Sequence, residues 1–571
     1  MRFLLTIITG SFLFLYFLSP VRAIVDPLSA PNNRYGIHIV DQNDLESAAK
    51  LVNSSGGDWG YVTLVIRADD RNHDKWQAIF DSMRRLHLIP LVRLATVPKG
   101  DIWVKPTLDE AKPWTEFLNS LNWVTKNRYV ILFNEPNHAK EWGGEVKPHE
   151  YAEVAKIYRN SLKDASSDFF VLPAGFDAAA GNGSETMSLE QYLKFMSAYD
   201  KDIFTRFDGW TSHAYPNPEF SGSIRDQGKT SLVSYRHELL LLNKLGLNKP
   251  LPIFITETGW VHNEGKSPQY GAYSAFKVAE LIPQAFNKVW TDSNLAAITP
   301  FLLNYQDEPF DHFSWTKPGG QDVYPQYVTV QNLSKTAGKP IQIDNAILLS
   351  DTIPSILVNN SVYEIPVYFQ NTGQSIWEPG VYEVVIDGNL LNSQSQRYAL
   401  EYTEPFNDAR ITLHLQTPLK TGSYTLNVRV EKNRQPIGSI TERDVRLIPP
   451  PSLLVKAQLW YQKITSGKDF TLLIYDDNGL VKKLEPFPVT DGVGMIPEIR
   501  DVIPQKRYRF VLTKTYYLPR QTYAILSPSQ TEIIFKRLLP VDLFPDGQLT
   551  LKDLWAAASR PNQVISLFFK R

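Results

Sequence analysis

The sequence predicts an α/β chain that opens with a (β/α)8 TIM barrel and continues into two C-terminal all-β domains, the first an immunoglobulin-like sandwich. Two observations predict this order. Up to about residue 306, short β-branched and apolar runs alternate with amphipathic stretches of about 12 to 18 residues, the pattern of repeated βα units. Beyond about residue 340 the helical periodicity stops, and runs of alternating polarity predict strands.

Eight runs in the first part read as strands, each bounded by polar residues, Gly or Pro. They cover residues 35–40, 60–66, 89–95, 129–134, 169–174, 207–213, 252–257 and 296–303. Eight strands with seven helical segments between them, in about 270 residues, have the size of a (β/α)8 barrel. A doubly wound sheet is the alternative, but it usually carries a Gly-rich phosphate turn after its first strand, and this sequence offers none there.

The remaining chain divides by composition. We expect a signal peptide at 1–23, the barrel at 24–338, the immunoglobulin-like sandwich at 339–449 and a second β domain at 450–571. The sandwich prediction depends on about seven alternating strands, such as 362–369 and 423–430. Three consecutive prolines at 449–451 predict a stiff linker before the last domain.

Composition excludes several classes of function. With 59 Lys and Arg against 60 Asp and Glu, the net charge is -1, so the basic footprint of a nucleic-acid binder is absent. The chain has no cysteine, which excludes disulfide frameworks, thiolate metal sites and cysteine nucleophiles. Aromatic residues make up 12% of the chain, a surplus that suits sugar binding as well as core packing.

The N-terminus predicts export. Arg2 is followed by an apolar run at 3–18, and small residues stand three and one positions before a cut after Ala23. This pattern is typical of a cleaved secretory signal, and an uncleaved membrane anchor is the alternative, since the run approaches the length of a membrane span. We therefore expect a secreted or cell-surface protein.

Two candidate strands end in a glutamate. Residues 130–138 place Glu135 after the fourth strand, and residues 253–260 place Glu257 at the end of the seventh. The carboxyl ends of barrel strands open on one face, so the two carboxylates can face each other there. Retaining cleavage of a glycosidic bond needs such a pair, with one group as acid/base and the other as nucleophile. We assign Glu135 the first role and Glu257 the second.

The neighbouring residues fit a sugar site. Asn134 can present its amide to a sugar 2-hydroxyl. His213 and Tyr215 stand at the end of the sixth strand, where the Tyr215 hydroxyl can keep the nucleophile ionised. Arg67, at the end of the second strand, can add a positive charge near it, or can instead form a salt bridge with an adjacent aspartate.

These motifs, Asn134-Glu135-Pro136 and Glu257-Thr258-Gly259-Trp260, resemble those of the clan A glycoside hydrolases, retaining β-glycosidases with a (β/α)8 barrel. The resemblance covers about residues 30 to 338. It implies Glu135 as general acid/base and Glu257 as nucleophile, with Asn134, His213 and Tyr215 binding the sugar on the nucleophile side. Arg67 matches the strand-two arginine of the cellulase-type family within the clan.

The eighth strand departs from that family. Its usual tryptophan is absent, and residues 299–305 offer only Phe301 and Tyr305 in its place. The stretch 306–310 is similar to the β-1,3-glucanase family, the second choice of family. Trp260, like Trp142 and Trp315, lies in a loop at the expected active face, where it can stack on sugar or anchor the loop.

A loop near the C-terminus resembles a single calcium loop of the dockerin or EF-hand type. It places Asp542, Asp546 and Asp553 at positions 1, 5 and 12, with Gly547 at position 6 and a helical run after it. Position 3 is Phe544, where an oxygen ligand is expected. The alternative is an Asp-Gly turn that caps a helix.

Together these features predict an exported, retaining β-glycoside hydrolase that cleaves a β-linked polysaccharide or oligosaccharide by double displacement, without a cofactor for catalysis. The alternative is a non-catalytic carbohydrate-binding or cell-surface protein on the same scaffold. We expect a monomer whose partner is the sugar substrate and not nucleic acid. The C-terminal module is a candidate for surface assembly, with a structural calcium ion.

Overall fold

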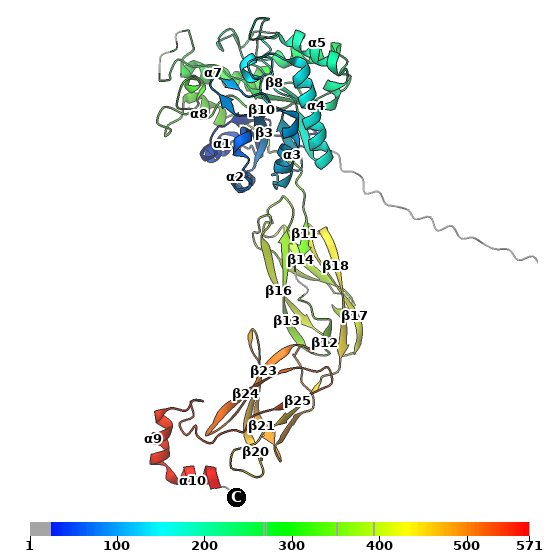
Figure 1. Cartoon of the computed structure of the whole chain (residues 1–571), viewed down its shortest axis with the longest axis vertical. Coiled ribbons are helices and arrows are strands. Elements are labelled where there is room, and N and C mark those ends of the chain that lie inside the picture. The colour runs from blue at the N-terminus through cyan, green and yellow to red at the C-terminus, as the bar shows by residue number, and fades with distance from the viewer. Residues whose placement is uncertain (1–23, 267–268, 270, 350–351, 392–393, 570–571) are drawn as a thin grey trace, which may run out of the picture. The chain divides into compact units, whose positions relative to one another are not determined.

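The computed structural model of the chain describes residues 24–569 except 267–268, 270, 350–351 and 392–393 (Figure 1). The chain divides into two compact units, Met1–Ile343 and Asp344–Arg571. The predicted signal segment lies outside the described residues. Within the described part, no helix combines the length and apolar character needed to cross a membrane.

Unit 1 has parallel strands at its centre, with helices around them (Figure 1). In its described residues, eight strands correspond to the eight predicted runs: β1 (Gly36–His38), β2 (Gly60–Arg67), β3 (Leu88–Ala95), β6 (Arg128–Ile131), β7 (Phe169–Leu172), β8 (Trp210–His213), β9 (Ile253–Glu257) and β10 (Leu295–Ile298). The α-helices are α1 (Leu45–Val52), α2 (His73–Arg85), α3 (Ala111–Ser120), α4 (Pro148–Ala165), α5 (Leu189–Tyr199), α6 (Ser234–Lys244), α7 (Ala275–Gln284) and α8 (Pro325–Gln331). A short antiparallel hairpin follows β3, and its strands, β4 (Pro98–Lys99) and β5 (Ile102–Trp103), have two residues each.

The strands of unit 1 pair in chain order. Apart from the hairpin β4-β5, they form a five-stranded sheet, β1-β2-β3-β6-β7, and a three-stranded sheet, β8-β9-β10, and every pair in these two sheets is parallel. A parallel bridge between Tyr35 and Ile298 links the β1 edge to β10, and one between Asp177 and His213 links the segment after β7 to β8. The two sheets therefore meet at both edges, as the predicted barrel requires.

The side chains of β3 point alternately into two buried clusters, so the strand is apolar on both faces. Val92 and Leu94 pack in the large cluster shared with the helices, whereas Ile89 and Leu91 pack in a second cluster contributed mainly by strands. Because side chains alternate along a strand, Arg93 points to the same side as Ile89 and Leu91, at the carboxyl end. The next subsection shows that this direction places Arg93 at the candidate site.

Unit 2 consists of strands until near its end, which confirms the all-β prediction for this half. Its first part has two sheets, β11-β13-β16 and β12-β18-β17-β14-β15, around one buried cluster. These strands are β11 (Ala346–Leu348), β12 (Ile356–Val358), β13 (Val362–Asn371), β14 (Tyr382–Asp387), β15 (Gln396–Ala399), β16 (Asp408–Gln416), β17 (Gly422–Lys432) and β18 (Gln435–Ile448).

The second part of unit 2 has its own buried cluster and two further sheets, β22-β19-β25 and β21-β20-β23-β24. Its elements are β19 (Ser452–Lys456), β20 (Gly467–Asp476), β21 (Gly479–Val489), β22 (Val493–Ile496), β23 (Arg507–Lys514), β24 (Tyr517–Ile525) and β25 (Gln530–Ile534), followed by α9 (Leu551–Ser559) and α10 (Pro561–Phe569).

The division between the units falls five residues after the expected end of the barrel. Residues 339–343 stay with unit 1 because they bond to the segment before β6. The Lys126 amide donates to the Ile341 carbonyl at 2.8 Å, and the Gln342 side chain donates to the Val124 carbonyl at 2.9 Å. These backbone partners are not visible in the composition of the sequence.

Candidate active site

Three side chains at or just beyond the carboxyl ends of strands form the centre of the site. Glu257 ends β9, His213 ends β8, and Glu135 follows β6 by four residues. The backbone at Phe133 and Glu135 has φ values of 72° and 30°, in the left-handed region that residues with a Cβ rarely adopt. Such strain persists where the surrounding structure holds it, and it is common at functional sites.

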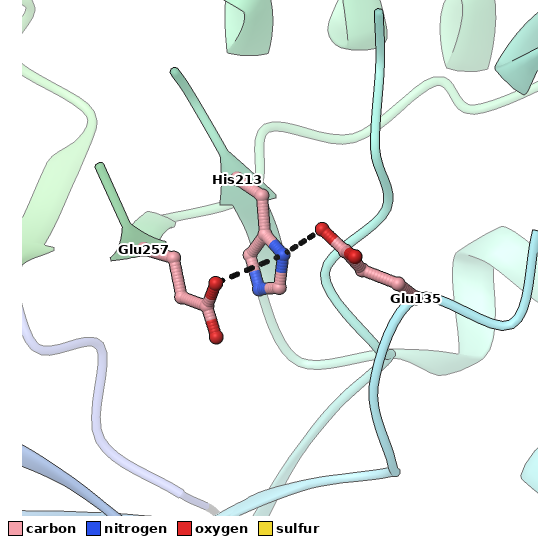
Figure 2. A group of neighbouring side chains, drawn as sticks. All are labelled: Glu135, His213 and Glu257. Atoms are coloured by element: carbon pink, nitrogen blue, oxygen red, sulfur yellow. Dashed lines mark hydrogen bonds and ion pairs between the residues drawn. The ribbon is translucent and has the colours of Figure 1, made fainter. Parts of the chain in front are cut away.

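His213 lies between the two carboxylates (Figure 2). Its Nδ1 is 2.8 Å from Oε1 of Glu135 and 3.7 Å from Oε2 of Glu257. One oxygen from each glutamate and a nitrogen of His213 all lie within 4.8 Å of one another. Carboxyl groups of retaining glycosidases are about 5 to 5.5 Å apart, whereas those of inverting enzymes are about 6.5 to 9.5 Å apart, so this separation fits retention.

Glu257 is buried and held by donors on both oxygens. Arg93 forms an ion pair with Oε1, and the Tyr215 hydroxyl donates to Oε2 at 3.0 Å. Burial by itself raises the pKa of Glu257, but the charges of His213 and Arg93 outweigh it and lower the pKa below its usual range. Glu257 is therefore ionised at neutral pH, as a nucleophile must be.

Tyr215 remains a hydrogen-bond donor at neutral pH. Burial, followed by the charges of Glu257 and Glu135, raises the pKa of Tyr215 well above its usual value. The phenol therefore keeps its proton and donates a hydrogen bond to the Glu257 carboxylate, the contact predicted from the sequence.

His213 fits beside the glutamates because Gly175 has no side chain. A Cβ on Gly175 would lie 2.2 Å from the ring atoms Cδ2 and Nε2 of His213. Burial lowers the pKa of His213, but the charge of Glu257 and the hydrogen bond to Glu135 outweigh it, and the net shift is upward. His213 therefore carries positive charge more readily than a free histidine and links the two carboxylates.

Arg93 also fixes the orientation of the Asn134 amide. Its Nη1 donates to Oδ1 of Asn134 at 2.8 Å, and the Nδ2 of Asn134 donates to Oε2 of Glu141 at 3.3 Å. Glu141 ends the 3-10 helix η4 (Ala139–Glu141). Burial, followed by the charge of Glu135, raises the pKa of Glu141. A continuous line of polar contacts thus runs from Glu257 through Arg93 and Asn134 to Glu141.

His38, the last residue of β1, lies beside this group. It is 1% exposed, and its ring packs edge-on against Phe301 with centroids 5.1 Å apart. Burial, followed by the charge of Arg93, lowers the pKa of His38 to about 3, so it is neutral. A neutral imidazole here does not compete with Arg93 for the negative charge of Glu257.

The structure brings together Glu135, Glu257, Asn134, His213 and Tyr215, as predicted, but it places Arg67 outside their cluster. The Arg67 side chain is 47% exposed and donates from Nε and Nη2 to Asp69 at 2.9 and 2.6 Å. The strand register explains this, because Arg67 pairs with Ala95, whereas Arg93 pairs with Val65. Arg67 is therefore two residues farther along its strand, beyond the level of Arg93.

The aromatic residues singled out in the loops are mostly packed into the fold. Trp260 is 3% exposed and donates from Nε1 to the Gly222 carbonyl at 2.8 Å, and Trp142 and Trp315 are also buried. These three tryptophans anchor loops instead of presenting a face to sugar. Tyr305 is half-buried, and its ring packs against Phe310 with centroids 5.5 Å apart.

Sequence reasoning missed Arg93, His38 and Glu141. The rule that found the glutamates, a polar residue near the end of a buried strand, also selects His38, which ends β1, and Arg93, two residues before the end of β3. Glu141 had a weaker signal, because it stands six residues after Glu135 and outside the predicted strands. Its position depends on η4, which turns the chain back toward Asn134.

The two glutamates and His213 also have the residue types of a metal site. One ligand atom from each lies close enough to the others to bind a single ion. However, both oxygens of Glu257 already accept from Arg93 and Tyr215, and the guanidinium would repel a second cation at the same carboxylate. The donor set therefore fits carboxylate catalysis better than metal binding.

The acidic loop near the C-terminus uses its carboxylates as caps. Asp542 accepts from the backbone amides of Asp546 and Gly547, both at 3.1 Å. Asp553 accepts from the Thr550 amide at 2.7 Å and completes a capping box at the start of α9. These contacts match the capping alternative, and the calcium ion stays a prediction.

Comparison with known proteins gives little guidance for this chain. It matches no protein-family model and no curated protein. A calcium-binding mutant of Bacteroides uniformis β-glucuronidase 2 is 10% identical, with 85% of this chain and 65% of the glucuronidase covered and a TM-score of 0.35. This chain thus spans less than two thirds of that protein.

Two other solved structures cover this chain less completely. A β-mannanase from Thermomonospora fusca is 13% identical, with 52% of this chain and 87% of the mannanase covered and a TM-score of 0.34. A glycoside hydrolase family 30 subfamily 8 xylanase from Clostridium acetobutylicum is 12% identical, with 71% and 98% covered and a TM-score of 0.32. Scores this low carry no argument about function, which depends on the site itself.

Proposed function

We propose that this chain is an exported, retaining β-glycoside hydrolase that cleaves a β-linked polysaccharide or oligosaccharide on a (β/α)8 barrel. The observation that carries the proposal is the separation of the Glu135 and Glu257 carboxylates, within 4.8 Å and with an imidazole between them. Export is proposed from the sequence of residues 1–23 alone.

In the first step, Glu257 attacks the anomeric carbon while Glu135 protonates the glycosidic oxygen of the leaving sugar. The low pKa of Glu257 supports its role, since the attacking group must be ionised. In the second step, Glu135 takes a proton from water, which hydrolyses the glycosyl-enzyme ester on Glu257. His213 contacts Glu135, so it can respond when Glu135 loses its proton in the first step and when Glu135 gains one in the second.

Asn134 supports the same mechanism from its fixed orientation. The Arg93 guanidinium can donate hydrogen bonds but cannot accept them. The side-chain oxygen of Asn134 must therefore face Arg93, and the side-chain nitrogen of Asn134 must face away. The nitrogen is thus available, beside Glu141, to donate to a sugar hydroxyl. Hydrogen bonds of this kind to the 2-hydroxyl strengthen in the oxocarbenium-like transition state.

The proposal is tested by replacing each glutamate separately. We expect Glu257→Gln to lower kcat at least about a thousand-fold on every substrate, because the covalent step is lost. We expect Glu135→Ala to be slow on sugar leaving groups and to recover on an activated aryl glycoside when azide is added, with a β-glycosyl azide as product. A 2-deoxy-2-fluoro glycoside should label a peptide that contains Glu257.

A matched control removes the same charge elsewhere. Glu190→Gln alters an exposed carboxylate on α5 that pairs with Lys194 at 2.8 Å, and it should leave activity unchanged. Full activity of Glu257→Gln would refute the proposal. Sugar binding by the wild type without hydrolysis, across a broad panel of β-glycans, would favour the non-catalytic alternative instead.

A further inference from the structure

An ion pair beside Glu135 takes no part in the mechanism described above. His138 stands three residues after Glu135, and Asp177 stands two residues after Gly175. The Nε2 of His138 is 2.9 Å from Oδ2 of Asp177, and the two side chains are 20% and 29% exposed. The pair is therefore partly open to solvent, so a ligand can reach it.

The pair is held rigidly by its own loops. Oδ1 of Asp177 accepts from the backbone amides of Ala179 and Ala180 at 2.8 and 3.2 Å. The Asn137 side chain joins the two loops, since its Nδ2 donates to the Asp177 carbonyl at 2.9 Å and its Oδ1 accepts from the Asp177 amide at 3.3 Å. A fixed polar group loses little freedom when it binds a ligand.

The surroundings of the pair favour the charged form of both members. Burial lowers the pKa of His138, but the hydrogen bond to Asp177 and the charges of Glu135 and Asp177 outweigh it, so the pKa rises. Burial raises the pKa of Asp177, but His138 and the two backbone donors outweigh it, so the pKa falls. The Lys140 charge also faces His138 and weakly opposes its protonation.

The pair lies on the acid/base side of the site. The His138 amide donates to the Glu135 carbonyl at 2.9 Å, and the Glu135 amide donates to the carbonyl of Gly175, two residues before Asp177, at 3.0 Å. Glu257 instead ends β9, which pairs with β8 and β10. In double displacement the acid/base protonates the oxygen that departs with the leaving sugar. A group that borders Glu135 away from the nucleophile therefore borders the leaving sugar.

We propose that His138 and Asp177 form the binding site for the leaving sugar, with the imidazolium donating to one hydroxyl and the carboxylate accepting from another. This inference depends on the proposed function and extends it. A charged donor and acceptor held side by side match vicinal hydroxyls of a neutral sugar, and they offer nothing to an apolar leaving group. The same pair would bind a sugar that accepts the glycosyl group in transglycosylation.

The test compares two substrates with the same sugar on the nucleophile side. One is a β-linked oligosaccharide that the wild type cleaves, and the other is the corresponding glycosyl fluoride, whose leaving group has no hydroxyls. We expect His138→Ala and Asp177→Asn to lower kcat/KM about 10- to 100-fold for the oligosaccharide, the range for hydrogen bonds to charged groups. We expect their kcat/KM for the fluoride to stay within about twofold of wild type.

A second histidine–aspartate pair supplies the control. Nδ1 of His87 is 2.8 Å from Oδ1 of Asp58, near the amino end of β3, so His87→Ala should leave both substrates unaffected. Asp177→Asn keeps an oxygen for the backbone amides, which preserves the loop if His138→Ala fails to fold. Equal losses on both substrates, or no loss on the oligosaccharide, would overturn the inference. If the wild type cleaves no β-linked oligosaccharide and no glycosyl fluoride, the proposed function is refuted and the inference with it.

Discussion

Replacing Arg93 by Met tests the electrostatics of the site most directly. Methionine has a similar length but no charge and no hydrogen-bond donor. The change removes the ion pair to Oε1 of Glu257 and the hydrogen bond to Asn134 while His213 and Tyr215 remain. The side chains of Arg93 and Glu257 are 12% and 10% exposed, so water screens this interaction only weakly.

The expected shift follows from the size of one charged hydrogen bond. Such a bond contributes about 1.5 to 3 kcal/mol, and about 1.4 kcal/mol corresponds to one pKa unit. Arg93 lowers the pKa of Glu257, so its loss raises that pKa, and the acid limb of the kcat/KM profile should move up by about 1 to 2 pH units. The loss of the Asn134 contact should lower the plateau about 10-fold or more.

The assay is the pH dependence of kcat/KM on an activated aryl glycoside, which reports ionisation of the free enzyme. Because Glu257 interacts with His213, the acid limb belongs to the cluster and not to one residue alone. The comparison variant is Arg67→Met, which removes an exposed guanidinium bonded to Asp69 and should leave the profile unchanged. A shift in Arg67→Met, or an unshifted profile in Arg93→Met, would refute the reasoning.

Three further changes probe the support of the site and the C-terminal turn. Glu141→Gln replaces the carboxylate that accepts from Nδ2 of Asn134 with a neutral amide, which weakens the contact that orients Asn134, so kcat/KM should fall about 3- to 10-fold. Gly175→Ala forces a Cβ against the His213 ring, and it should lower kcat/KM at least about 10-fold and destabilise the fold by about 1 to 3 kcal/mol in thermal unfolding. Asp553→Ala removes a cap of α9 and should lower its hydrogen-exchange protection by about 0.5 to 2 kcal/mol, with or without a calcium chelator.

Each of these changes has its own control. Glu190→Gln supplies the charge-matched comparison for Glu141→Gln, because Glu190 lies on the outer surface of α5. Gly181→Ala matches Gly175→Ala, since a Cβ at Gly181 meets nothing within 4 Å. An unaltered kcat/KM in Glu141→Gln, a fully active Gly175→Ala, or a chelator that alone abolishes the protection of α9 would contradict the respective argument. The last result would support the calcium prediction.

The sequence predicted the strands of unit 1, and it predicted that the two glutamates lie close together, because both predictions depend on local patterns. Buried parallel strands need continuous apolar runs on both faces, so their positions are visible in the sequence. A charged residue that ends such a run is unusual, and in a parallel arrangement the ends of the runs meet on one face. This rule identified Glu135 and Glu257 without any knowledge of the contacts.

The same pattern does not indicate whether Arg67 or Arg93 contacts Glu257. Both stand near the ends of strands and both follow the inward alternation, so they differ only in how far each strand extends beside its neighbour. That difference is the register of β2 against β3, in which Val65 faces Arg93. Register is set by packing along the whole sheet and by the turns, which no local pattern encodes.

The sequence by itself determined which residue types could act here: two glutamates at strand ends, with an asparagine, a histidine and a tyrosine beside them. Only the tertiary structure decided which cation meets Glu257, that the loop tryptophans are buried, and that Gly175 leaves room for the His213 ring. The physical reason is the sequence separation of the residues that interact. Apolar periodicity is a property of neighbours in the chain, whereas ionisation and hydrogen bonding depend on distances of a few ångströms between residues far apart in it.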